Sequence, residues 1–147
     1  MIRTEKRLRL AYTLLALNLV FIWGNSLLPG ELSGAISDWV KELLSHLLAG
    51  TPSAGGGGGL LRKLAHFTEF AALGMCLGWI AGMLAKPRSR ALLAGILAAC
   101  IDETIQVFVP DRGPSLIDVG IDSCGVLTGI TLLYFGYDYL KRKHNKE

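Results

Sequence analysis

The feature that most constrains the fold is a series of four apolar segments, each near the roughly 20 residues that cross a bilayer as a helix. They cover about residues 8–28, 61–84, 91–109 and 115–140. Hydrophobic residues make up 51% of the chain, which is too apolar for an ordinary soluble domain, and 147 residues suit one small domain. We therefore predict an all-α, four-transmembrane-helix bundle that forms a single domain over residues 1–147.

Basic residues orient this bundle. Of the 15 Lys and Arg, most lie before the first segment, between the second and third, or after the fourth. These are Arg3, Lys6, Arg7, Arg9, Lys86, Arg88, Arg90, Lys141, Arg142, Lys143 and Lys146. With four spans, the three places lie on one side, which the positive-inside rule makes cytoplasmic. We expect both termini in the cytoplasm, and we attribute the basic character to topology and anionic membrane lipids rather than to nucleic acid.

The connection between the first two spans contains an amphipathic stretch at about residues 34–49. Its apolar side chains follow helical spacing: Ile36, Trp39, Val40, Leu43, Leu44, Leu47 and Leu48. The stretch is too short to span, so we predict an extracytoplasmic helix lying in the membrane interface. Residues 55–59 are all glycine and should form a flexible tether. The helix could serve as a connector or as a lid over an outer-leaflet site.

Ionisable residues interrupt three of the four spans. Asp102 and Glu103 lie in the third, His66 and Glu69 in the second, and Asp118 and Asp122 in the fourth. Such residues are expensive in hydrocarbon, so they mark either a functional site or a buried polar network.

Helical spacing predicts that these residues face one another. Asp102 and Gln106 continue a stripe of small residues in the third span, and Ser115, Asp118 and Asp122 continue one in the fourth. Small residues at four-residue spacing let membrane helices approach closely, so both stripes should face inward. All the groups lie about 10 Å from the outer ends of their spans. We therefore expect one acidic, histidine-bearing pocket in the outer half of the bundle.

Motifs in three of the predicted helices carry a family resemblance. They are Lys63-Leu64-Ala65-His66-Phe67-Thr68-Glu69-Phe70, Asp102-Glu103-x-x-Gln106-x-Phe108-x-Pro110-x-Arg112-x-x-Ser115-x-x-Asp118, and Gly125. In this combination the chain resembles the VanZ-like family of bacterial membrane proteins, from about Trp23-Gly24-Asn25-Ser26 to Gly129. The resemblance implies a small multi-pass protein of the bacterial cytoplasmic (inner) membrane. It also implies a link to teicoplanin resistance, with which the founding member is associated.

One position departs from the family pattern. Asp122 stands where the family usually has Asn, four residues after Asp118. The additional carboxylate raises the local negative charge, so a role that required an amide there would not carry over to this chain.

Three interpretations stay open. The first is an enzyme acting by acid–base chemistry at the outer leaflet. Its candidate catalytic residues are His66, Glu69, Asp102, Glu103, Asp118 and Asp122, and its candidate substrate-binding residues are Arg62, Gln106, Arg112 and Ser115. The arginines suit a phosphate or carboxylate headgroup, so the substrate would be an amphipathic or lipid-linked envelope molecule.

The second interpretation is binding without turnover, of membrane lipids, a lipid-linked cell-wall intermediate or a lipoglycopeptide antibiotic. The third is a structural polar network that fixes helix register. In that case Ser115-x-x-Asp118 would be a capping box, and Asp118 would serve only the start of its helix.

A divalent cation is a further option for the same cluster. His66-x-x-Glu69 places two ligands on one helix face, and carboxylates from two other helices could complete an oxygen-rich shell. A single histidine at this level disfavours tight zinc binding.

Overall fold

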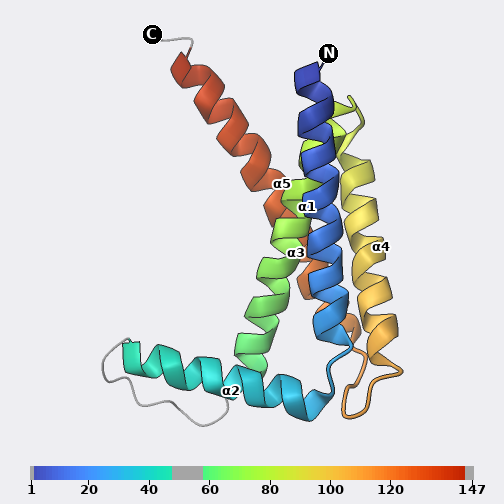
Figure 1. The fold of residues 1–147 in the computed structure, drawn as a ribbon, viewed down its shortest axis with the longest axis vertical. Coiled ribbons are helices and arrows are strands. Elements are labelled where there is room, and N and C mark those ends of the chain that lie inside the picture. Colours follow the sequence, from blue (N-terminus) through green and yellow to red (C-terminus); the bar gives the residue numbers. More distant parts are fainter. Residues whose placement is uncertain (1, 48–57, 145–147) are drawn as a thin grey trace.

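The computed structural model describes residues 2–47 and 58–144, and these ranges form five α-helices and no strand. The helices are α1 (Ile2–Ser26), α2 (Gly30–Leu47), α3 (Gly58–Met83), α4 (Arg88–Gln106) and α5 (Leu116–His144). Four of them, α1, α3, α4 and α5, run side by side, while α2 lies across one end of this bundle (Figure 1). The first turn of α1 and the last turn of α5 lie at the opposite end. The predicted all-α class is confirmed.

The helix bounds differ by a few residues from the approximate predicted ranges, and two of the differences have a clear physical reason. The third apolar segment reaches Val109, yet α4 ends at Gln106, because the ring of Pro110 would clash with the carbonyl four residues before it. Gly58 and Gly59 were assigned to the tether over 55–59, yet they belong to α3, since extending a helix is far easier than nucleating one. The rest of the tether falls outside the described residues.

Three helices are long and apolar enough to cross a membrane. Their qualifying portions are Thr4–Ser26 in α1, Gly59–Met83 in α3 and Leu116–Lys143 in α5. The helix α4 is not among them, because its 19 residues include Arg88, Arg90, Asp102 and Glu103.

The exterior of the bundle is apolar on every long helix. Large exposed side chains include Leu17, Val20 and Phe21 on α1, Leu64 on α3, Leu93 and Leu97 on α4, and Leu127, Leu132 and Phe135 on α5. A soluble monomer rarely exposes so much contiguous apolar surface, and lipid is the solvent in which such a surface is stable. The fold is therefore that of a membrane protein.

Close backbone packing joins α3 to α5, the most extensive helix contact in the described structure. A Cβ atom on Gly129 would collide with the backbone carbonyl of Ala71, and one on Gly74 would collide with that of Val126. The glycines therefore permit an approach that any larger residue would prevent. Around this seam, the buried core includes Ile22, Phe70, Leu73, Val126 and Ile130.

The start of α2 is fixed to the loop between α4 and α5. The N–H of Gly30 donates a hydrogen bond to the carbonyl of Pro110 at 3.1 Å. A Cβ atom on Gly30 would collide with the backbone of Asp111, so only glycine allows this contact. Farther along α2, the exposed apolar side chains Leu32, Ile36 and Trp39 follow helical spacing.

Candidate functional site

At the α2 end of the bundle, α1 and α4 end and α3 and α5 begin (Figure 1). Polar side chains gather there. The buried polar and charged residues of the described structure all belong here or to the adjoining loop: Ser26, Asp102, Glu103, Gln106, Arg112 and Asp122. At 1.5 Å per residue, His66 lies about 12 Å into α3, Asp122 about 9 Å into α5, and Asp102 about 6 Å before the end of α4. The α4 residues thus lie closer to a helix end than the sequence predicted.

Asp102 is fully buried and held by two hydrogen bonds. The hydroxyl of Ser26 donates to its Oδ1 at 2.7 Å, and the Nε2 of Gln106 donates to its Oδ2 at 3.0 Å. Gln106 also donates to Glu103 at 3.1 Å and accepts from Arg62 at 2.9 Å. Gln106 therefore links α4 to the arginine of α3 and fixes one side of Asp102.

Glu103 takes part in the start of α5. Its Oε2 accepts a hydrogen bond from the backbone N–H of Ser115 at 2.7 Å, while the Ser115 hydroxyl accepts from the N–H of Asp118 at 3.4 Å. In a capping box, the Asp118 side chain would bond the N–H of Ser115. Because Glu103 occupies that N–H, the carboxylate of Asp118 is left to face the neighbouring pocket.

The end of α1 supplies partners that the sequence analysis missed. Asn25 donates from its Nδ2 to Oε1 of Glu69 at 3.1 Å, and Ser26 bonds Asp102 as described. The available signal was the pair of polar residues at the end of the first apolar segment, which also belongs to the stretch that resembles the family.

Arg112, predicted to contact substrate, uses two of its nitrogens on the backbone. Its Nε donates to the carbonyl of Leu28 at 3.1 Å, and its Nη2 donates to that of Asn25 at 2.9 Å. These bonds satisfy one carbonyl in the last turn of α1 and one just after it, as basic side chains often do at helix C-termini. Burial lowers the pKa of the Arg112 guanidinium from its ordinary value. In this structure Arg112 connects the α4–α5 loop to α1.

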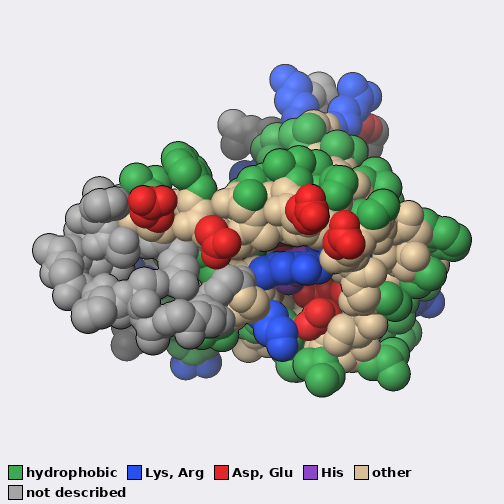
Figure 2. All heavy atoms as spheres, turned by 90° about the horizontal axis from the view of Figure 1, so that it is seen from below, with side chains coloured by type: hydrophobic (Ala, Val, Ile, Leu, Met, Phe, Trp, Pro, Cys, Tyr) green, Lys and Arg blue, Asp and Glu red, His purple; other side chains and the backbone are tan. Residues whose placement is uncertain are grey.

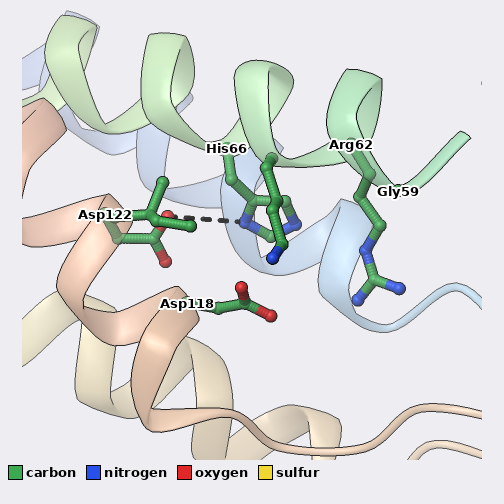
Figure 3. Close-up of a pocket in the computed structure, with 7 residues that line it drawn as sticks. Gly59, Arg62, His66, Asp118 and Asp122 are labelled. Carbon is green, nitrogen blue, oxygen red and sulfur yellow. Dashed lines mark ion pairs between the residues drawn. The ribbon is translucent and has the colours of Figure 1, made fainter. Parts of the chain in front are cut away.

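A pocket of about 120 Å³ opens between the start of α3 and the start of α5. Its lining consists of Gly59, Arg62, Lys63, His66, Asp118, Ile121 and Asp122. Viewed from the α2 end, basic and acidic side chains surround a hollow in the surface (Figure 2). Within the pocket, His66 of α3 and Asp122 of α5 point toward each other, and Arg62 lies nearer the opening (Figure 3).

His66 lies between two carboxylates without a hydrogen bond to either. Its Nδ1 is 3.8 Å from Oδ1 of Asp122 and 3.9 Å from Oδ2 of Asp102. Both separations exceed the hydrogen-bonding range. The three donor atoms lie within 4.8 Å of one another, a spacing at which they could share a metal ion.

Several buried atoms of this cluster lack a hydrogen-bond partner among the described residues. They are His66 Nδ1, Glu69 Oε2, Arg112 Nη1, Asp118 Oδ1, and both carboxylate oxygens of Asp122. Buried polar atoms in folded proteins are nearly always paired. The unpaired atoms of the described residues are thus concentrated at and beside this pocket. All ten sequence-predicted site residues lie in this cluster or its immediate hydrogen-bonding partners.

The apolar exterior, the three candidate spans and the polar cluster at one end define a helical membrane protein. The profile of the VanZ/LLP1 family matches residues 8–137, and the chain belongs to that family. The resemblance found in the motifs is thus confirmed. Searches among curated proteins and among solved structures returned no significant match.

Proposed function

We propose that this VanZ-like protein binds the anionic headgroup of an amphipathic or lipid-linked envelope molecule at the outer leaflet of the bacterial cytoplasmic membrane. The observation that carries the proposal is the pocket between α3 and α5, where two basic side chains border unpaired, buried polar atoms.

The topology behind the proposal has four spans, with α4 as the third. Leu93, Leu97 and Ile101 are exposed along one side of α4, while Asp102, Glu103 and Gln106 are buried. A helix with this division suits a position between lipid and the bundle interior. Lys86 of the α3–α4 loop and Arg90 in the first turn of α4 lie at the end away from α2, which the positive-inside rule assigns to the cytoplasm. Then α2 lies in the outer interface.

Charge and size favour a headgroup as the ligand. Arg62 and Lys63 line the pocket, and paired cations at an opening suit phosphate or carboxylate groups. Pockets that enclose drug-sized molecules measure roughly 300–1,000 Å³. A pocket of about 120 Å³ is too small to enclose a glycopeptide, but it suits one polar end of a lipid whose chains stay beside the helices. A resistance-type role would follow if the bound lipid is one with which the antibiotic interacts.

The alternative, a purely structural network, fits the contacts less well. A network retained for stability should pair its own polar atoms, since unpaired ones cost about 1–3 kcal/mol each. Here both carboxylate oxygens of Asp122 and the Nδ1 of His66 are unpaired within the described residues.

The experiment uses two lipids with the same acyl chains, phosphatidic acid and diacylglycerol, which differ only in the phosphate. Retention of each lipid by the full-length chain is measured by native mass spectrometry. We expect at least tenfold preference for phosphatidic acid, because only this lipid offers an anion to Arg62 and Lys63. Arg62→Gln and Lys63→Gln should reduce that preference.

Arg90→Gln, an exposed arginine at the opposite end, is the matched control and should retain the preference. Equal retention of the two lipids, or equal loss in all three variants, would contradict the proposal. Release of a chemically altered lipid would show turnover, for which His66 and its two neighbouring carboxylates are the candidate acid–base groups.

A further inference from the structure

We infer that His66, Asp102 and Asp122 form a binding site for a divalent transition-metal cation. The site would form the inner wall of the pocket. Its role in headgroup binding rests on the proposed function, but its existence does not.

The geometry of the three donor atoms is close to that of a coordination shell. A cation about 2.1 Å from each ligand places neighbouring ligand atoms about 3.0 Å apart in an octahedral shell and about 3.4 Å apart in a tetrahedral one. His66 Nδ1 lies 3.8 Å from Asp122 Oδ1 and 3.9 Å from Asp102 Oδ2. The two distances from His66 need a contraction of about half an ångström for a tetrahedral shell and about 0.9 Å for an octahedral one. The oxygens of Asp102 and Asp122 lie within 4.8 Å of each other. Small rotations of side chains on three different helices can bring the atoms closer.

Asp122 is the observation that separates this cluster from an ordinary acidic group. Its side chain has no exposed surface, and neither carboxylate oxygen has a hydrogen-bond partner in the described structure. Figure 3 shows it directed toward His66 from the facing helix. A buried carboxylate left without hydrogen bonds is strongly disfavoured unless another charge compensates it.

Asp102 is prepared in a different way. Ser26 and Gln106 hold its two oxygens in place, and Arg62 in turn bonds Gln106. Hydrogen bonds of this kind orient the ligands of natural metal sites. Asp102 is therefore a fixed ligand, whereas Asp122 has both oxygens available.

The charge balance also favours a cation. Within residues 2–47 and 58–144, the ion-pair contacts of Asp102 and Asp122 are both with His66. The two nearest arginines bond elsewhere, Arg62 to an amide and Arg112 to backbone carbonyls. A divalent ion would neutralise both carboxylates while His66 remains a neutral ligand.

The donor set points to a particular class of ion. Imidazole nitrogen suits first-row transition metals, while carboxylate oxygens suit harder ions such as Mn²⁺ and Ca²⁺. One imidazole combined with two carboxylates therefore favours Mn²⁺ over Ca²⁺, which prefers an all-oxygen shell. Unpaired oxygens of Asp118 and Glu69 nearby could orient bound water.

The test titrates Mn²⁺ alone into the full-length chain, purified in detergent, treated with chelator and given no added lipid. Electron paramagnetic resonance measures free and bound Mn²⁺, and pulsed measurements detect a coordinated imidazole nitrogen. We expect one bound ion per chain, at least tenfold tighter than Ca²⁺, with a nitrogen signal. His66→Gln and Asp122→Asn should each weaken binding more than tenfold.

Asp138→Asn serves as the matched control, because Asp138 is an exposed residue of the same helix as Asp122, far along α5. It should bind Mn²⁺ like the parent. The inference would be overturned if the parent did not bind one Mn²⁺ per chain. It would also be overturned if His66→Gln and Asp122→Asn bound Mn²⁺ as tightly as the parent. If these variants fail to fold, the parent protein alone still tests the inference. Mn²⁺ bound to the parent without a signal from a coordinated nitrogen would overturn the inference. Since no lipid is present, failure here leaves the headgroup proposal standing on its own experiment.

Discussion

The same two helices, α3 and α5, are joined in two different ways along their length. Toward the cytoplasmic end of the proposed topology, glycines bring the backbones together, as at Gly74 and Gly129, and no charged residue occurs at 70–85 or 123–137. Toward the α2 end, His66 faces Asp122 across a pocket with unmade hydrogen bonds. The packed half can supply most of the helix association, so the polar half is free to be poorly paired. Stability and ligand binding are thereby assigned to different ends of one helix pair.

Among substitutions that test this contrast between the two halves, Gly129→Ala should have the largest effect on the free energy of unfolding. The new Cβ would collide with the carbonyl of Ala71, which belongs to helix backbone and cannot rotate away. Overpacking of this kind should lower the free energy of unfolding by roughly 2–3 kcal/mol. Reversible unfolding in mixed detergent micelles measures the change.

Gly136→Ala, in the same helix, is its control. No atom lies within 4 Å of a Cβ at Gly136, so the substitution should be neutral or slightly stabilising. If both variants lose the same free energy, the close α3–α5 contact is not what holds the bundle.

A pair of carboxylate-to-amide substitutions sharpens the contrast within the polar half. Glu103→Gln places an amide where both carboxylate oxygens accept hydrogen bonds, from Gln106 and the N–H of Ser115. This substitution should lower the free energy of unfolding by about 1–2 kcal/mol. Asp122→Asn removes an unpaired buried carboxylate, so it should leave the unfolding free energy unchanged or raise it.

Thermal unfolding of the two variants, in detergent and without added metal, measures the difference. A structural polar network would make both substitutions destabilising. Equal losses would therefore favour the structural alternative over a ligand site.

A smaller effect is expected for Ser26→Ala. The substitution removes the 2.7 Å hydrogen bond to Oδ1 of Asp102 and should cost about 1 kcal/mol of unfolding free energy. Ser89→Ala, at an exposed position near the start of α4, should change it little. Mn²⁺ affinity should also fall in Ser26→Ala, because Asp102 would be oriented less firmly. If Ser26→Ala were as stable as Ser89→Ala, the hydrogen bond from Ser26 to Asp102 would not contribute to stability.

The smallest effect should come from Ser115→Ala. The hydroxyl caps α5 through a long bond of 3.4 Å to the N–H of Asp118, so its loss should cost about 0.5 kcal/mol. Amide hydrogen exchange should rise in the first turn of α5 and remain unchanged in α3. Faster amide exchange in α3 as well would mean that the packed and polar halves of the α3–α5 pair do not unfold independently.

Sequence reasoning predicted which polar residues come together because the helical period fixes which side chains share a face. Asp102, Gln106 and Asp122 each follow a stripe of small residues, and small residues mark the inward face of a membrane helix. It failed at the end of α4, where the hydropathy of Val107 and Val109 concealed the steric effect of Pro110.

Hydrogen-bond pairing could not be derived from the sequence at all. Glu103, rather than Asp118, bonds Ser115, and Asn25 and Ser26 reach Glu69 and Asp102. Each of these partnerships depends on the relative height of two helices. A shift of one residue, about 1.5 Å, would exchange one partner for another, and spacing along a single helix carries no such information.

The contact between Gly30 and the α4–α5 loop has a consequence for how the protein responds to its membrane. Because α2 is fixed to that loop, and Arg112 fixes the loop to α1, the amphipathic helix and the mouth of the pocket should move together. Under the proposed topology, α2 stays at the level of the headgroups, so it also sets the height of the pocket. A thicker or thinner bilayer would then change the tilt of the spans rather than the depth of the pocket. Access to the pocket would thus be insensitive to bilayer thickness.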